Sequence, residues 1–306
     1  MVVKHYITKR KFNMKKIALA TILAAASIAA SAQVTVYGKL RMYEESTTVG
    51  SAPAVTALTN DTSRLGFKGT EALGSGLSAN FTIETSVGAD APAATSLGDR
   101  TVVVGLSNKY GSIAGGRDKH TIARTLDNYD AMGNVYGSSV TTIHAAQGSR
   151  VSNALFLSAT PVTGLTVTYI NSNSETAGVT NAQSSSIEYI RGPIAATVAR
   201  YDSGTNSASN IFGARFTVAQ TGTTLFGLYS DDTVSGVSSS GKTVGINQPL
   251  TGSLMALASY GEKDSVKAYD LGATYALSKR TFVNARYVKE DATATAKYAL
   301  GLEHNF

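Results

Sequence analysis

The chain of 306 residues has no cysteine, no tryptophan and only five prolines. Without cysteine it forms no disulfide and offers no thiolate nucleophile or ligand, so packing and hydrogen bonding alone must hold the fold. The four histidines are scattered, and neither a G-x-S-x-G elbow nor a glycine-rich phosphate loop occurs. We therefore expect no enzyme, no catalytic residue, no metal site and no cofactor.

Long hydrophobic runs are also lacking, apart from one between Ile17 and Ala30. That run is interrupted by polar residues and is shorter than the roughly 20 residues that a membrane-spanning helix needs. Six basic residues precede it, and the small residues Ala30-Ser31-Ala32 follow it. This order predicts a secretory signal peptide over residues 1–32 and a mature protein over residues 33–306. Met1 and Met14 both remain possible starts.

The excess of positive charge belongs to this segment. The whole chain has a formal net charge of +6, from 27 Lys and Arg against 21 Asp and Glu. Removing residues 1–32 removes six basic residues and no acidic one, which leaves 21 of each sign. A near-neutral mature chain gives no reason to expect a nucleic-acid partner.

After residue 33 the apolar residues recur with a period of two. Val34, Val36 and Leu40 alternate with polar positions that include Lys39 and Arg41, and the same division recurs through the last segment of the chain. Such alternation places apolar and polar side chains on opposite faces of a β-sheet. No convincing helical periodicity competes with it, so the fold class is all-β.

Sixteen segments read as strands. They lie at 34–43, 62–71, 76–87, 99–107, 111–117, 149–160, 164–172, 183–191, 193–202, 209–219, 222–231, 239–248, 252–262, 265–277, 280–290 and 296–306. Short connections tend to alternate with longer ones such as 44–61, 118–148 and 232–238, which is typical of a transmembrane antiparallel barrel with short turns on one rim. A sandwich has no reason to alternate in this way, and a barrel of 16 strands encloses an aqueous channel. We also expect the last strand to pair with the first and close the sheet.

Several segments resemble the general porins of β-proteobacteria, which are trimeric sixteen-stranded outer-membrane channels. They are VTVYGKL (34–40), SRLGFKGTEALGSGL (63–77), VGLSNKYGSIAGGRD (104–118), YALSKRT (275–281) and ALGLEHNF (299–306). They occur in the family order and span the whole mature chain. The resemblance implies an outer-membrane location and a homotrimer. It also implies a third loop, here residues 118–148, that folds into the pore.

In that family, acidic residues on the third loop face basic residues on the opposite wall. The corresponding pore-constriction residues here are Lys39, Arg41, Arg64, Lys68 and Arg150 on the wall, and Asp118, Asp127 and Asp130 on the loop. Arg215 and Arg286 lie further round the predicted barrel. Two departures from the family pattern, Phe156 and Glu303 where basic residues are common, lower the expected anion selectivity.

The resemblance predicts passive diffusion of small hydrophilic solutes and ions, with a weak to moderate preference for anions. The expected partners are outer-membrane lipid, lipopolysaccharide, the solutes and two further copies of the chain. Two alternatives stay open: a substrate-specific channel, and a non-channel barrel that serves adhesion.

Overall fold

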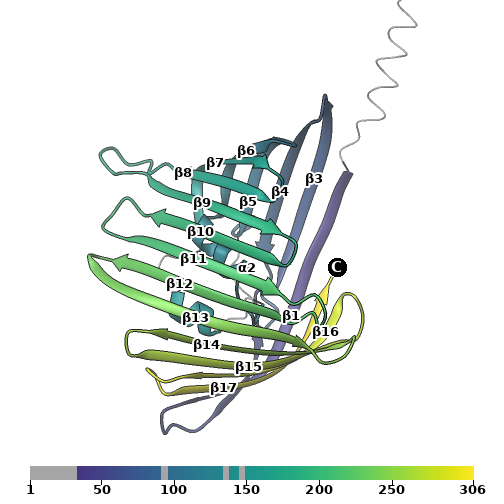
Figure 1. The fold of residues 1–306 in the computed structure, drawn as a ribbon, viewed down its shortest axis with the longest axis vertical. Coiled ribbons are helices and arrows are strands. Elements are labelled where there is room, and N and C mark those ends of the chain that lie inside the picture. The colour runs from purple at the N-terminus through teal and green to yellow at the C-terminus, as the bar shows by residue number, and fades with distance from the viewer. Residues whose placement is uncertain (1–32, 91–95, 134–137, 145–148) are drawn as a thin grey trace, which may run out of the picture.

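The computed structural model describes residues 33–90, 96–133, 138–144 and 149–306. The predicted signal peptide, residues 1–32, lies outside the described residues. Strands follow one another as antiparallel neighbours and curl into a barrel, with the first and last strands side by side (Figure 1). None of the helices in the described part of the chain has the length and apolar character to cross a membrane.

The strands are β1 (Gln33–Val49), β2 (Val55–Asn60), β3 (Arg64–Gly74), β4 (Leu77–Ser86), β5 (Thr101–Asn108), β6 (Gly111–Lys119), β7 (Arg150–Val162), β8 (Leu165–Ser172), β9 (Ala182–Arg191), β10 (Ile194–Asp202), β11 (Ala208–Thr217), β12 (Thr224–Val234), β13 (Val237–Pro249), β14 (Leu254–Lys263), β15 (Val266–Ala276), β16 (Thr281–Glu290) and β17 (Thr295–Asn305). Two helices, α2 (Thr121–Asn128) and α3 (Ser139–His144), lie between β6 and β7.

The barrel closes through β1. On one side β1 pairs with β17, and on the other it pairs first with β3 and then with β2. β2 and β3 therefore act as one strand interrupted at residues 61–63, where Thr62 has a φ of 56°. The predicted antiparallel barrel of 16 strands, closed by pairing of the first and last strands, is confirmed.

Two connections differ from the prediction. Residues 44–61, predicted as a loop, consist mainly of the end of β1 and all of β2, because this Val- and Thr-rich stretch finds partners on both sides. The loop predicted at 232–238 is a hairpin turn of Ser235 and Gly236, whose φ values of 52° and 82° suit a tight two-residue turn.

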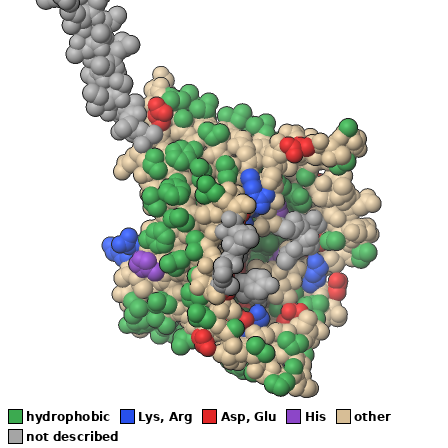
Figure 2. All heavy atoms as spheres, turned by 180° about the vertical axis from the view of Figure 1, so that it is seen from behind, with side chains coloured by type: hydrophobic (Ala, Val, Ile, Leu, Met, Phe, Trp, Pro, Cys, Tyr) green, Lys and Arg blue, Asp and Glu red, His purple; other side chains and the backbone are tan. Residues whose placement is uncertain are grey.

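The two faces of the wall have opposite character. Val34 and Val36, on the outer face of β1, are each 54% exposed, whereas Lys39 and Arg41 on the inner face are 8% and 4% exposed. Apolar side chains also gather on the outer surface in Figure 2. An apolar exterior and a polar interior reverse the pattern of a water-soluble protein and match a barrel that faces lipid.

Candidate functional site

Two helices within the longest predicted connection, residues 118–148, contact the barrel wall. α2 contacts β9, β10 and β11, and α3 contacts β13, β14 and β15. The wall residues at these contacts, such as Ala199 and Ile211, are 2% exposed, while their outward neighbours Val198 and Phe212 are 58% and 47% exposed. Both helices therefore lie on the inner face of the wall.

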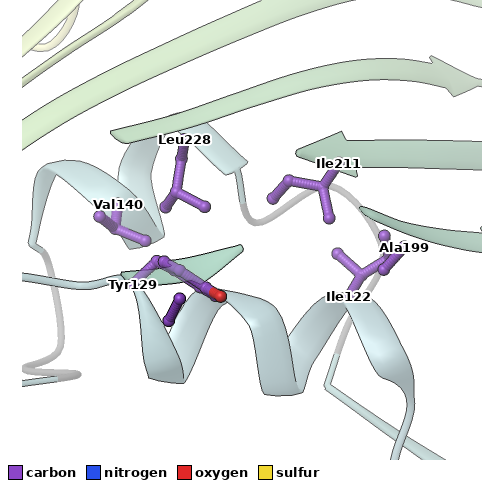
Figure 3. Packing of buried hydrophobic residues seen from close by; sticks show 7 residues of the cluster. Ile122, Tyr129, Val140, Ala199, Ile211 and Leu228 are labelled. Atoms are coloured by element: carbon purple, nitrogen blue, oxygen red, sulfur yellow. The ribbon is translucent and has the colours of Figure 1, made fainter. Parts of the chain in front are cut away.

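A small apolar core fixes α2 in this position. Figure 3 shows Ile122, Tyr129 and Val140 of the connection pointing toward wall residues that include Leu228. The Tyr129 hydroxyl lies 3.0 Å from the Thr197 hydroxyl oxygen, so one donates to the other. The ring also needs a glycine beneath it, because a Cβ at Gly213 would lie 2.8 Å from the Tyr129 Cδ2 atom.

Polar contacts fix α3. At its start, the Ser139 backbone N–H donates to the Asp270 carboxylate at 2.6 Å. At its end, the ring nitrogens of His144 lie 2.8 Å from the Ser230 hydroxyl and 2.9 Å from the Thr243 hydroxyl. Burial of the ring lowers the pKa of His144 from its ordinary 6.5 to about 4; nearby Asp232 opposes this shift and Lys263 adds to it.

The contact between His144 and Ser230 lacks the features of a catalytic pair. The second ring nitrogen meets the Thr243 hydroxyl, whereas an orienting group in a hydrolase is usually a carboxylate. His144 and Ser230 are only 3% and 1% exposed, so a substrate has no access to the serine oxygen. In the described ranges, no group of three or more His, Asp or Glu side chains is placed to bind a metal ion. The pair serves to hold α3 on the wall.

Acidification should loosen α3. A docked His144 binds its proton only near pH 4, whereas a released histidine binds it near pH 6.5. The docking free energy is therefore complete above about pH 6.5 and falls as the pH drops toward 4, by an amount on the order of 3 kcal/mol. Because the chain has no cysteine, a single spin label at Thr142→Cys should report rising α3 mobility across this range.

The control for this measurement is His144→Gln in the same labelled background, since glutamine retains hydrogen bonding to both hydroxyls without titrating. It also separates the effect of protonating His144 from the effect of protonating Asp270, the carboxylate that faces the other end of α3. Equal mobility changes with and without His144 would refute the assignment.

Beside the connection lies a charged cavity of about 340 Å³, which we call the mixed-charge cavity. Its five basic residues are Lys39, Arg64, Arg100, Lys119 and Arg150, and its three acidic residues are Glu84, Asp118 and Asp127. The structure thus brings together five of the eight residues predicted from the sequence: Lys39, Arg64, Arg150, Asp118 and Asp127. The lining has a formal excess of two positive charges.

The acidic residues of this cavity are already engaged. The Glu84 carboxylate lies 2.6 Å from the Nε of Arg100 and 3.5 Å from the Nε of Arg64. Asp127 pairs with Lys119, and Asp118 pairs with Arg124 at 2.8 Å. Lys39 and Arg150 have no ion pair within 4 Å among the described residues, so neither side chain has a direct counterion in this lining.

Arg41 lies apart from the predicted constriction residues that line this cavity. It does not line the mixed-charge cavity but is buried between two carboxylates, Asp61 at 3.0 Å and Glu303 at 3.3 Å. It also donates to the Asp61 carbonyl at 3.2 Å and to the Thr62 hydroxyl at 2.8 Å. Arg41 therefore ties β1 to the break between β2 and β3 and to β17, and Glu303 has a partner that the sequence did not reveal.

Lys68 and Asp130 also lie outside the mixed-charge cavity. Lys68 lines a separate hollow, and its ammonium nitrogen lies 5.1 Å from the centroid of the Tyr37 ring. Asp130 is buried within the connection, where it accepts hydrogen bonds from the Met132 backbone and the Ser138 hydroxyl. Phe156 packs on the inner wall with Val151 and Ile170, so this stretch of wall is apolar.

Sequence reasoning missed Arg100, Lys119 and Glu84. Arg100 lay in the predicted strand 99–107, but it precedes the observed β5, which begins at Thr101, so the alternation did not give its orientation. A register shift between Gly116 and Asp118 breaks the alternation just before Lys119. Glu84 lies in the predicted strand 76–87, and its alternation with the apolar Phe81 and Ile83 was the available signal that it faces the lumen.

Comparison with known proteins agrees with this architecture. The family profile described as Gram-negative porin matches residues 18–295. The chain belongs to the Gram-negative porin family. Similar curated proteins include the major outer membrane protein P.IB of Neisseria meningitidis strain H44/76, at 31% identity over 122 residues, and protein P.IA of the same strain, at 32% over 129 residues. The match with P.IB covers 37% of this chain and 37% of P.IB, and the match with P.IA covers 34% of this chain and 33% of P.IA. The porin thus spans about a third of the length of these relatives.

Solved porin structures share the fold over nearly the whole described chain. The anion-selective porin from Comamonas acidovorans superposes with a TM-score of 0.79 at 21% identity, covering 90% of this porin and 100% of that chain. Salmonella typhi OmpF superposes with a TM-score of 0.72 at 16% identity, covering 90% and 98%. These likenesses show the barrel fold, and membership of the Gram-negative porin family places this barrel in the outer membrane.

Proposed function

We propose that the porin is a passive diffusion channel for small hydrophilic solutes and ions, with a weak to moderate preference for anions. The observation that carries this proposal is the mixed-charge cavity, where Lys39 and Arg150 remain without a counterion beside the inner-face connection. A positive field in a confined aqueous path concentrates anions and repels cations. The porin from Comamonas acidovorans, which is described as anion-selective, supports the same sign.

The connection carrying α2 and α3 narrows this channel in our proposal. Its support is the packing of both helices on the inner wall, which leaves less room for solute. Selectivity then follows from size exclusion at this level and from the charges of Lys39, Arg64, Arg150, Asp118 and Asp127. Such a path uses no catalytic residue and no cofactor, so the porin works as a channel rather than an enzyme.

Residues 1–32 direct export in this proposal, and residues 33–306 form the barrel. The assembly is a homotrimer, supported by the trimer form named for Vibrio cholerae OmpT, which shares the fold with a TM-score of 0.69 at 12% identity. Outer-membrane lipid and lipopolysaccharide cover the apolar outer face, and nucleic acid is not a partner.

Single-channel recording of the refolded protein in a planar bilayer under a KCl gradient tests the proposal. We expect conductance steps grouped in threes and a reversal potential that favours chloride. A folded barrel without conductance would overturn the channel and favour an adhesive role. Saturation of the current by one solute class at low concentration would favour a substrate-specific channel.

A further inference from the structure

The rim of the barrel that carries the short turns has basic residues in its turns and no acidic ones. Because neighbouring strands are antiparallel, every second connection lies on this rim, from the turn after β3 to the turn after β15, all in the described part of the chain. The acidic residues of β3 and β17, Glu71 and Glu303, lie within their strands. We call this edge the basic rim, after the charged residues within its turns or directly next to them: Lys109, Arg191, Lys279 and Arg280.

The hairpins of the opposite rim are mainly acidic. Those after β8, β10, β12, β14 and β16 contain or adjoin one basic residue, Lys263, and the acidic residues Glu175, Asp202, Asp264, Glu290 and Asp291. The long connection after β6 lies on this rim as well. Outer-membrane barrels have short turns toward the periplasm and longer loops toward the cell exterior, so the basic rim faces the periplasm.

The cations of the basic rim have no acidic partners. In the described ranges, none of the four forms an ion pair. Lys109 instead lies over a ring, with its ammonium nitrogen 4.8 Å from the centroid of Tyr110. Exposed charges of one sign that have no counterions attract an anionic partner to this edge of the barrel.

The turn after β15 holds two of these cations side by side. The backbone N–H groups of Arg280 and Thr281 each donate to the Ser278 hydroxyl at 3.1 Å. The Asn305 N–H donates to the Arg280 carbonyl at 2.8 Å, which joins the turn to the end of β17. The turn is therefore fixed within itself and to its neighbour, and Lys279 and Arg280 leave the wall at adjacent positions.

An exposed apolar side chain accompanies the cations on each of these turns. Tyr110 in the turn after β5 is 65% exposed, and Leu277 in the turn after β15 is 59% exposed. Ile194, directly opposite Arg191 in the strand register, is 49% exposed. Lysine and arginine beside apolar surface place their stems against it and their charged heads in the polar layer. The turns are too short to project far, so these groups stay at the level of the lipid headgroups.

Two kinds of periplasmic partner offer negative charge, a cell-wall polymer and an anionic lipid. A polysaccharide has no apolar surface to cover Tyr110, Leu277 and Ile194, whereas a phospholipid presents its phosphate and its acyl chains at adjacent depths. We propose that the basic rim preferentially binds anionic glycerophospholipids of the phosphatidylglycerol type in the periplasmic leaflet. This adds a lipid class to the proposed contact with outer-membrane lipid, and it rests on that contact rather than on ion conduction.

Fluorescence quenching in lipid vesicles tests this preference. The chain has no tryptophan, so Leu277→Trp in the refolded, full-length porin gives a tryptophan signal from the basic rim alone. The vesicles contain phosphatidylcholine with a minor fraction of phosphatidylglycerol, and bromine is attached to the acyl chains of the phosphatidylglycerol or of an equal amount of phosphatidylcholine. We expect the brominated phosphatidylglycerol to quench about threefold more strongly, because basic residues at a membrane surface attract anionic lipid.

Two changes should abolish this difference. Lys279→Gln together with Arg280→Gln, in the same reporter background, removes the two cations nearest to the tryptophan. High salt acts on the unsubstituted rim, since the Debye length falls to about 3 Å at 1 M. The matched control Lys242→Gln with Lys289→Gln removes two exposed lysines near the opposite rim and should leave the difference unchanged.

Equal quenching by the two brominated lipids at position 277 overturns the proposal, and so does a preference that survives both the double substitution and high salt. Val237→Trp places the same reporter on the opposite rim, at a residue that is 71% exposed, and should show no preference for phosphatidylglycerol. Bilayer conductance of the wild-type porin is a separate measurement. A conducting porin without a lipid preference overturns the basic rim alone, and a barrel that prefers phosphatidylglycerol but does not conduct counts against the channel alone.

Discussion

Replacing Lys39 and Arg150 together by glutamate is expected to turn the channel from anion-favouring to cation-favouring. The mixed-charge cavity has five basic and three acidic residues, and the double substitution inverts this to three and five. Both side chains lack ion pairs among the described residues, so their charge acts on solute without a neighbouring counterion. We expect the chloride-to-potassium permeability ratio to fall at least tenfold, which corresponds to about 1.4 kcal/mol. The reversal potential in a KCl gradient measures it directly.

Lys68→Glu is the matched control for this prediction. It reverses one charge on the same inner wall, half the change made by the double substitution, but Lys68 lies outside the mixed-charge cavity, over the Tyr37 ring. Its effect on the reversal potential should be much smaller, because water and salt screen charges beyond about 10 Å at 0.1 M ionic strength. An equal shift from Lys68→Glu would mean that the whole lumen sets selectivity, and would contradict the assignment to Lys39 and Arg150.

The largest loss of stability is expected from Arg41→Met. This change removes a guanidinium that is only 5% exposed and leaves the carboxylates of Asp61 and Glu303 without it, at 6% and 17% exposure. Removing one partner of a buried ion pair typically costs about 3–5 kcal/mol, because the remaining charge stays buried. The concentration of guanidinium chloride at which half of the barrel in lipid vesicles is unfolded should fall accordingly.

Arg200→Met provides the comparison, since Arg200 also pairs with an aspartate, Asp202, at 3.1 Å, but both side chains are about half exposed. An exposed pair contributes little, roughly 0–1 kcal/mol. Similar midpoints for the two variants would show that Arg41 does not hold the wall together as we infer.

The sequence predicted the strands well because each one alternates between lipid and lumen. All sixteen segments correspond to strands of the barrel, and Lys39 and Arg41 lie on the inner face, as their position opposite Val34 and Val36 indicated. The short strand β2 was missed, because the sequence did not show that β1 continues to Val49 and so offers β2 a partner.

The candidate site was predictable only in part. A period of two assigns a residue to a face but does not give its partners along the wall, so the burial of Arg41 between Asp61 and Glu303 could not be foreseen. Arg100 precedes the observed β5 and Asp130 lies outside the strands, so the period of two did not give the partners of either residue. The two helices of that connection were also missed, since each is too short to show a helical repeat.

The pairing of β1 with β17 has a consequence for how the barrel assembles. Gly38 and Phe306, whose backbones hydrogen-bond to each other, are 268 positions apart in the chain, so the pairing of β1 with β17 demands the largest loop closure among the described strand pairings. Contacts of such separation form slowly. Until they form, the nascent sheet has two free edges with unpaired backbone groups, and each edge is a template for pairing with another chain. The time between synthesis of the last strand and its arrival at β1 is therefore the period in which the porin is most prone to aggregate.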